Sequence, residues 1–182
     1  GVSENRFSKD QLNAFIARAL EVTGMPDENA RIVAELMAEA DLNGSDGHGI
    51  IRLPSYIRRI REGGINLTPD IHIVQEKSGM ALVDGDNAQG HLVMKYCAER
   101  AIEKAMTSGV AWVGARYRNH AGPANLYAKM PLSHDMIGIY VAVGNANHLP
   151  PWGGTAMLLS TNPIAAAVPG LEEPPVVLDM AT

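Results

Sequence analysis

A short polar segment in the first third of the chain contains two side chains that together could transfer a proton and bind a carboxylate. Residues 46–52 read Asp-Gly-His-Gly-Ile-Ile-Arg, which places His48 four residues before Arg52. If a helix begins here, the two side chains lie on the same side of it. An imidazole transfers protons near neutral pH, and a guanidinium binds a carboxylate through two hydrogen bonds. The alternative is a helix-entry turn with a surface arginine, and the spacing leaves both open.

Two further segments carry polar groups at positions where ligands commonly bind. Residues 118–123 follow an expected strand and precede an expected helix, a junction that often presents ligand-binding groups in α/β proteins. His120 in this segment is therefore a candidate for acid–base chemistry, with a turn or helix-capping role as the alternative. Residues 145–154 form a loop that is rich in amide side chains and stiffened by two prolines, and this loop could surround a polar ligand.

The other histidines and the single cysteine have structural explanations. A strand, a helix start and a surface turn account for His72, His91 and His134, respectively. Cys97 lies on the apolar face of an expected helix and is interpreted as a small buried side chain rather than a reactive thiol. No histidine–carboxylate spacing indicates a metal site, so none is expected. The Gly-x-Gly-x-x-Gly, Walker, Cys-x-x-Cys and Gly-x-Ser-x-Gly patterns do not occur in the sequence.

Length and composition exclude several classes of protein. The 182 residues are 46% hydrophobic and 19% charged, so the chain carries enough apolar material for a core without disulfides. The net charge is −5, and the scattered basic residues offer no surface for nucleic acid. No apolar run reaches the ~18 residues of a membrane span, and the first residues lack a signal-peptide pattern. We therefore expect a cytoplasmic protein that binds neither nucleic acid nor a membrane.

The periodicity of apolar residues predicts helices first and a mixture of strands and helices afterwards. A capping box at Ser8 opens a helix that ends at Gly24, and two more helices follow. Residues 1–65 are thus expected to be a helical N-terminal region, and residues 66–182 the first part of an α/β domain. Strands are expected at 71–74, 80–83, 110–115 and 137–143, and the one at 110–115 is expected to be buried. Helices are expected at 26–43, 53–63, 90–107 and 122–133, a loop at 116–121, and apolar runs at 164–168 and 176–179. The strand–helix–strand succession over 110–143 predicts a crossover connection.

Five segments, in this order, match the motifs of one known family: 46–54, 119–122, 151–154, 160–163 and 178–182. The chain resembles the non-Rossmann malate/L-lactate dehydrogenase superfamily, which includes ureidoglycolate, sulfolactate and diketogulonate oxidoreductases and cyclic-imine reductases. The resemblance extends over nearly all of the sequence. It implies a helical N-terminal region followed by an unusual mixed-sheet, non-Rossmann cofactor-binding domain, in agreement with the missing Gly-x-Gly-x-x-Gly pattern.

The resemblance also implies an activity and the residues that perform it. The activity is an NAD- or NADP-dependent hydride transfer between a small 2-hydroxy acid, or a related amino acid, and its 2-oxo or imino form, in a homodimeric enzyme. By match to the family's motifs, His48 and His120 are the acid–base candidates, and Arg52 and Asn119 are the candidates for binding the carboxylate substrate. The matched cofactor-binding positions are Gly144, Thr161, Asn162, Asp179, Met180 and Ala181, and Gly144 stands where the family often has a serine.

Two departures from the family pattern affect these expectations. Gly47 occupies a position where many relatives have a serine, so a hydroxyl that could contact the substrate or orient His48 is missing. The family also continues beyond the segment that ends at Thr182, and we expect a second polypeptide to complete the sheet and the core. A nick or a shortened polypeptide is one alternative. Another is cleavage after Thr182 that frees an N-terminal Ser, Thr or Cys nucleophile on a second chain, which would make the protein a self-processed hydrolase.

Overall fold

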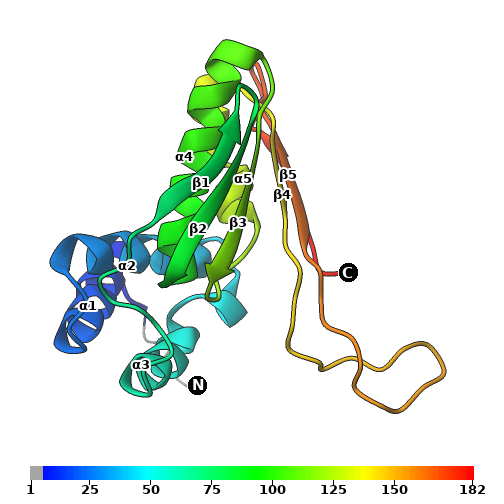
Figure 1. Ribbon diagram of the computed structural model, residues 1–182. Helices are drawn as coiled ribbons and strands as arrows, with labels where there is room; N and C mark the ends of the chain where they lie inside the picture. The colour runs from blue at the N-terminus through cyan, green and yellow to red at the C-terminus, as the bar shows by residue number, and fades with distance from the viewer. Residues whose placement is uncertain (1–5) are drawn as a thin grey trace. The chain divides into compact units, whose positions relative to one another are not determined.

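The chain forms two compact units, each with its own small sheet (Figure 1). The computed structural model describes residues 6–182, and the division between the units follows Pro123. The domain boundary expected between residues 65 and 66 lies inside the first unit, where the helical region and the elements after it share one core. The expected mixed α/β fold is confirmed.

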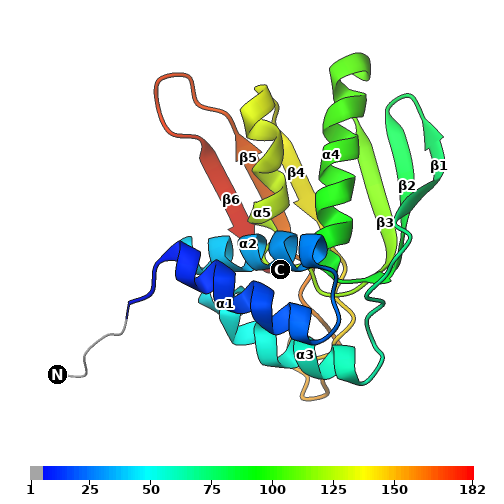
Figure 2. The same ribbon diagram turned by 90° about the vertical axis from the view of Figure 1, so that its left-hand side faces the viewer.

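Three helices lie together at one end of the first unit (Figure 2): α1 (Lys9–Val22), α2 (Asp27–Leu42) and α3 (Leu53–Arg61). The predicted capping box opens α1, because the Ser8 hydroxyl accepts the N–H of Gln11 and the Gln11 side chain accepts the N–H of Ser8. No helix in the described part of the chain is both long and apolar enough to cross a membrane. The apolar faces of the three helices pack into one core, whose central residues are Ile16, Leu20, Val33, Met37, Tyr56 and Ile60.

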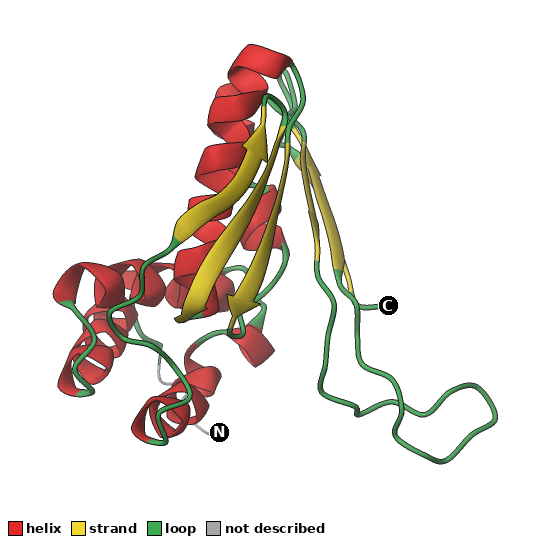
Figure 3. Ribbon diagram, viewed as in Figure 1, coloured by secondary structure: helices red, strands yellow, loops and turns green. Residues whose placement is uncertain are grey.

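A three-stranded mixed sheet forms the rest of the first unit. Its strands are β1 (His72–Lys77), β2 (Met80–Ala88) and β3 (Trp112–Arg118), in the order β1-β2-β3. β1 and β2 are antiparallel, whereas β2 and β3 are parallel because α4 (Gly90–Ser108) crosses over between them. Figure 3 shows α4 covering one face of this sheet. Gly109, in the left-handed conformation with φ at 79°, ends the helix.

The single cysteine lies in the core between α4 and the sheet. Cys97 is 2% exposed and packs with Val83, Ala88 and Val93. Burial raises the pKa of the Cys97 thiol to about 12, because the thiolate would lose its contact with water. The interpretation of this residue as a small buried side chain is therefore confirmed.

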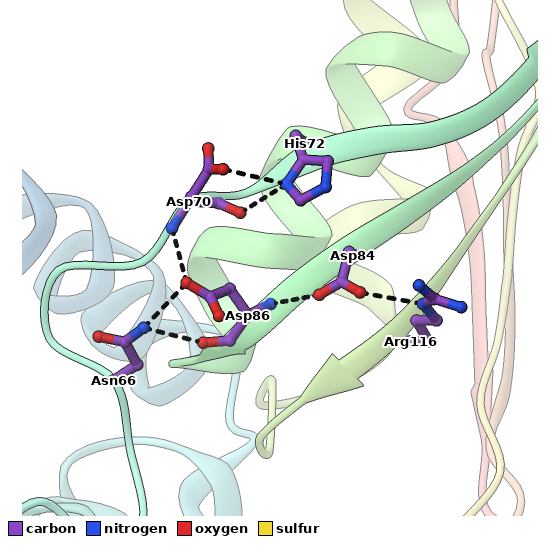
Figure 4. Close-up of polar contacts among 6 residues, drawn as sticks. All are labelled: Asn66, Asp70, His72, Asp84, Asp86 and Arg116. Atoms are coloured by element: carbon purple, nitrogen blue, oxygen red, sulfur yellow. Dashed lines mark hydrogen bonds and ion pairs between the residues drawn. The ribbon is translucent and has the colours of Figure 1, made fainter.

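An irregular stretch in the second half of β2 is held by carboxylates that accept backbone and side-chain hydrogen bonds (Figure 4). Asp86 has a positive φ of 47°, a conformation that aspartate tolerates better than most residues. Its carboxylate accepts hydrogen bonds from the Asn66 side chain and from the N–H of Asp70. Asp84 accepts the N–H of Asp86 and also binds Arg116 on β3. The hydrogen bond from Asp86 is the main cause of a lowered pKa at Asp84.

The second unit contains an antiparallel sheet and a short helix. Its strands are β4 (Gly138–Val141), β5 (Ile164–Val168) and β6 (Val176–Met180), in the order β4-β5-β6. The helix α5 (Asn125–Ala128) packs on this sheet, and Tyr127 stacks on Tyr140 with their ring centroids 5.3 Å apart. The apolar runs noted in the sequence at 164–168 and 176–179 are thus strands.

Two expectations for the segment between β3 and β4 are wrong. The helix expected over 122–133 is α-helical only in α5 and continues as the 3-10 helix Met130–His134. Pro131 explains the break, because proline cannot donate a backbone hydrogen bond and clashes with the preceding turn of an α-helix. β3 and β4 belong to different sheets, so the crossover is β2-α4-β3 and not the one predicted over 110–143.

The strand β3 itself also differs from its prediction. It extends to Arg118, into the expected loop, and its side chains are half-exposed or exposed instead of buried.

The helical core gives a direct test of this packing. Leu20 is fully buried and Val22 is 70% exposed, although both belong to α1. Leu20→Ala should lower the free energy of unfolding by about 2–5 kcal/mol, since it removes buried methyl groups and leaves a cavity. Val22→Ala should change it by less than about 0.5 kcal/mol. Urea denaturation followed by circular dichroism measures both, and equal effects of the two substitutions would contradict the assigned core.

Candidate active site

A carboxylate at the end of α2 anchors the loop that carries His48. Oδ2 of Asp41 accepts the N–H of Ile50 at 2.8 Å. Gly49 packs directly against this carboxylate, since a Cβ atom at Gly49 would lie 1.9 Å from Oδ1. Burial is the main cause of a raised pKa at Asp41, with the nearby Asp46 charge adding to it. One partly buried hydrogen bond and one glycine therefore fix the path of the loop.

The predicted helix start between His48 and Arg52 is replaced by two short 3-10 helices, Asp46–His48 and Ile50–Arg52, which lead into α3. Nε of Arg52 donates to the carbonyl oxygen of Gly47 at 2.6 Å. Within the described residues this is the one hydrogen bond of the guanidinium group, and the side chain is exposed. Its terminal nitrogens are therefore positioned by the loop and available to a carboxylate.

The structure brings together the two imidazoles that the sequence separates widely. The ring centroids of His48 and His120 are 5.8 Å apart, and the ring planes differ by 14°. The Arg52 guanidinium is held at the carbonyl oxygen of Gly47, the residue before His48, and its charge contributes to a lowered pKa of His120. Two imidazoles and one guanidinium thus share one face of the first unit.

His120 is a neutral imidazole under physiological conditions. Its pKa is lowered to about 4, mainly because packed protein atoms replace the water that would stabilise the charged ring. The nearby groups His48, Arg52 and Arg118 lower it further by charge repulsion. The residue as a whole is nonetheless exposed, so His120 is both partly desolvated and accessible from solvent.

Tyr56 is a residue of this site that the sequence analysis did not single out. Its hydroxyl lies 2.7 Å from Nδ1 of His120, while its ring is buried in the helical core. Arg52 and Tyr56 are four residues apart, at the start and on the inner face of α3. That spacing is the signal that could have identified Tyr56, because residues four apart lie on one side of a helix.

Asn119 holds the segment that carries His120. Its Oδ1 accepts a hydrogen bond from Nε of Arg59 at 2.7 Å, and its Nδ2 donates to the carbonyl oxygens of Asn87 and Ala88 at 2.9 and 3.0 Å. Both ends of the amide are thus engaged within the protein, and the side chain is buried. These contacts fix the segment that carries His120, and the substrate contact expected of Asn119 stays a prediction.

A second buried histidine packs against Tyr56. His91, at the start of α4, is fully buried, and its ring meets the Tyr56 ring edge-on with the centroids 5.8 Å apart. The Gln89 side-chain nitrogen lies 3.2 Å from Nδ1 of His91. Burial is the main cause that lowers the pKa of His91 to about 3, so this ring is also neutral. The sequence analysis treated His91 as part of a helix start, and nothing in the spacing indicated its contact with Tyr56.

The candidate cofactor-binding residues all lie in the second unit. Oδ1 of Asn162 accepts the N–H of Gly144 at 3.0 Å, and the Thr182 hydroxyl donates to the Asn162 carbonyl oxygen at 2.6 Å. Asp179 accepts hydrogen bonds from the backbone and the side chain of Asn125, at the start of α5. The structure therefore brings Gly144 and Asn162 together near the end of β6 and ties Asp179 to α5. The remaining candidates Thr161, Met180 and Ala181 belong to the same two segments.

Gly144 cannot be replaced by the serine of the family pattern without a shift of the backbone. A Cβ atom at Gly144 would lie 2.3 Å from the Ser160 hydroxyl and 2.3 Å from the Thr161 carbonyl oxygen. The loop from 145 to 154 pairs with the following segment through a bridge between Leu149 and Leu159. Across residues 6–182, no group of three or more His, Cys, Asp or Glu side chains is arranged to hold a metal ion.

Comparison of the sequence with known proteins identifies the family to which the chain belongs. The family model for malate/L-lactate dehydrogenase matches residues 7–182. The chain belongs to the malate/L-lactate dehydrogenase family. Malate dehydrogenase of Pyrococcus horikoshii is 44% identical over 184 residues, which is 100% of this chain and 50% of that protein. L-sulfolactate dehydrogenase of Methanocaldococcus jannaschii is 42% identical over 92% of this chain and 48% of its own length.

Solved structures of this family share the fold described above. The crystallographic chain of the Pyrococcus horikoshii malate dehydrogenase superimposes with a TM-score of 0.92 at 42% identity, over 98% of this chain and 51% of that chain. The sulfolactate dehydrogenase of Methanocaldococcus jannaschii gives a TM-score of 0.90 at 40% identity, over 96% of this chain and 50% of that chain. The chain thus spans about half the length of the family members that it matches.

The anchored loop predicts opposite outcomes for two neighbouring glycines. Gly49→Ala would force its new methyl group into the Asp41 carboxylate, so we expect the free energy of unfolding to fall by about 1–3 kcal/mol. A methyl group at Gly47 would meet nothing within 4 Å, and Gly47 has no positive φ, so Gly47→Ala should change stability by less than about 0.5 kcal/mol. Thermal unfolding of both variants checks this, and a destabilised Gly47→Ala with an unaffected Gly49→Ala would contradict the loop anchor.

Proposed function

We propose that this chain carries the proton-transfer and carboxylate-binding groups of an NAD- or NADP-dependent 2-hydroxy acid dehydrogenase. The observation that carries the proposal is the stacked pair of His48 and His120, with centroids 5.8 Å apart and Arg52 beside them. Interconversion of a hydroxyl and a carbonyl group needs a proton donor and acceptor at the oxygen atom. The relatives named malate, L-sulfolactate and ureidoglycolate dehydrogenase support a substrate of this class.

Each group of the cluster has a distinct task in this reaction. Arg52 binds the carboxylate that all small 2-hydroxy acids carry, and its contact with Gly47 keeps the guanidinium at the entrance of the loop. In this proposal the two imidazoles, stacked on each other, between them exchange the proton of the neighbouring substrate oxygen and stabilise its charge. Asn119 and Arg59 act behind them by fixing the segment that carries His120.

The second unit offers groups that fit the neutral parts of a dinucleotide. The candidate groups are the Asn162 amide, the Thr161 hydroxyl and the backbone at Gly144. The Thr161 carbonyl oxygen lies so close to Gly144 that a Cβ atom has no room there. These groups suit the hydroxyl and amide functions of a nicotinamide riboside. Lys129 is the one Lys or Arg in the sequence from 124 to 182, so phosphate groups would bind mainly through backbone N–H donors here. When bound, the nicotinamide supplies or accepts the hydride.

The complete enzyme, in this proposal, is larger than the chain described. Because the relatives are about twice as long, segments that correspond to their second half contribute to the cofactor site, either on the same polypeptide or on a second one. The complete unit acts as a homodimer in the cytoplasm. Gel filtration with light scattering measures the assembly.

Turnover tests the proposed activity. The complete protein should oxidise NADH or NADPH in the presence of a small 2-oxo acid, measured by the loss of absorbance of the reduced cofactor. His48→Asn and His120→Asn should each lower kcat by about 10²–10⁴, the range of general acid–base catalysis. His134→Asn, an exposed histidine of the second unit, is the control and should leave kcat unchanged. Absence of binding to both reduced cofactors, or unchanged kcat in both site variants, would refute the proposal.

Carboxylate recognition is tested separately. Arg52→Lys keeps the charge but loses the two-nitrogen contact, so KM for the 2-oxo acid should rise about tenfold or more with a smaller effect on kcat. Arg58→Lys is the matched control, because Arg58 is exposed on the same helix stretch. An equal rise of KM in both variants would show an unspecific effect of replacing a guanidinium in this stretch and would rule out the specific role of Arg52.

A further inference from the structure

Nδ1 of His120 faces hydrogen-bond donors from two directions. The Tyr56 hydroxyl lies 2.7 Å from this nitrogen, and the backbone N–H of Gly122 donates to it at 3.4 Å. A backbone N–H can only donate, so Nδ1 must present a lone pair to Gly122. A neutral imidazole then carries its single proton on the other ring nitrogen, which is Nε2.

The Tyr56 hydroxyl is placed to donate its proton and not to receive one. Burial of Tyr56 raises the pKa of its phenol far above the ordinary value, so the group stays protonated. Within residues 6–182 the contact with His120 is the one hydrogen bond of this hydroxyl, and donation to Nδ1 satisfies its buried proton. His91, packed edge-on against the phenol ring, holds the tyrosine in this position.

We propose that Tyr56 is a positioning residue that holds neutral His120 as its Nε2–H tautomer, so that His120 acts as a hydrogen-bond donor to the substrate carbonyl oxygen. The inference rests on the proposed function for the identity of the acceptor, whereas the tautomer is a property of the protein alone. An N–H fixed at the carbonyl oxygen stabilises the negative charge that develops there during reduction. The proton that completes the new hydroxyl group then comes from His48, the neighbouring imidazole.

The surroundings of His120 oppose its conversion to a cation. The groups that face it are His48 and Arg52 from the loop before α3, Arg118 at the end of β3, and His91 on α4. Protonation at Nδ1 would place a third donor where two donors already converge. The neutral ring is therefore favoured both by charge and by hydrogen bonding.

The decisive measurement is the nitrogen spectrum of the histidine rings in the purified protein labelled with 15N at histidine. The signals of His120 are assigned by their loss in His120→Gln. Between about pH 6 and pH 8 we expect an unprotonated Nδ1 and a protonated Nε2. A proton on Nδ1 of His120 overturns the proposal. The spectrum requires neither cofactor nor substrate, so this result is independent of the proposed function.

Tyr56→Phe removes the donor and keeps the aromatic packing. We expect a mixture of the two tautomers of His120. We also expect its titration midpoint to rise toward the ordinary value of about 6.5, because the phenol hydroxyl no longer opposes a proton on Nδ1. In turnover, kcat should fall about tenfold while KM changes less than about twofold, since the correct tautomer is only partly populated. Tyr96→Phe on α4, whose ring lies under Arg100, is the matched control and should change none of these values.

The outcomes separate the two proposals. If the spectra behave as expected but the complete protein turns over no 2-oxo acid, the proposed function fails and the assignment of Tyr56 stands. If turnover occurs but Tyr56→Phe, folded as judged by circular dichroism, leaves both the 15N shifts and kcat unchanged, the role of Tyr56 is refuted. If Tyr56→Phe does not fold, the spectrum of the unmodified protein decides.

Discussion

The hydrogen bond between Tyr56 and His120 is the contact on which the candidate site depends. It joins α3 to the segment after β3, and the Arg59–Asn119 hydrogen bond joins the same two elements beside it. The buried ring of Tyr56 belongs to the helical core, while its hydroxyl reaches the imidazole. The packing that stabilises the first unit thus also sets the orientation of a reactive group, and the two cannot be varied separately.

Sequence patterns predicted the elements that bury one face along a regular period. α1 to α4, β2 and the capping box at Ser8 follow from such local signals, whereas β1 was predicted from a short apolar run and is almost entirely exposed. The prediction of one helix over 122–133 was wrong because it rested on the apolar residues of this segment and did not allow for the helix-breaking effect of Pro131. β3 was expected to be shorter and buried, since its burial depends on neighbours in space that periodicity does not reveal.

For the candidate site, too, the sequence predicted some features and not others. Motif matches named His48, Arg52 and His120, yet their proximity depends on the crossover through α4, which no local spacing specifies. Tyr56 was not singled out, because its ring fits the apolar stripe of α3 and such a pattern carries no information about its hydroxyl. The substrate contact of Asn119 stays a prediction, and the structure adds that both ends of its amide form hydrogen bonds within the protein. Residues that act through other residues are thus the ones that the sequence conceals.

The two contacts that close the site also determine when it can form. Tyr56 and His120 are 64 residues apart in the sequence, and Arg59 and Asn119 are 60 apart. Contacts between such distant residues carry a large loop-closure entropy and form late, after local helices are in place. α1 to α3 can therefore assemble early during synthesis, but the two imidazoles meet only once β3 has paired with β2. Before that pairing, the helices of this unit can already be present while its two imidazoles are still apart.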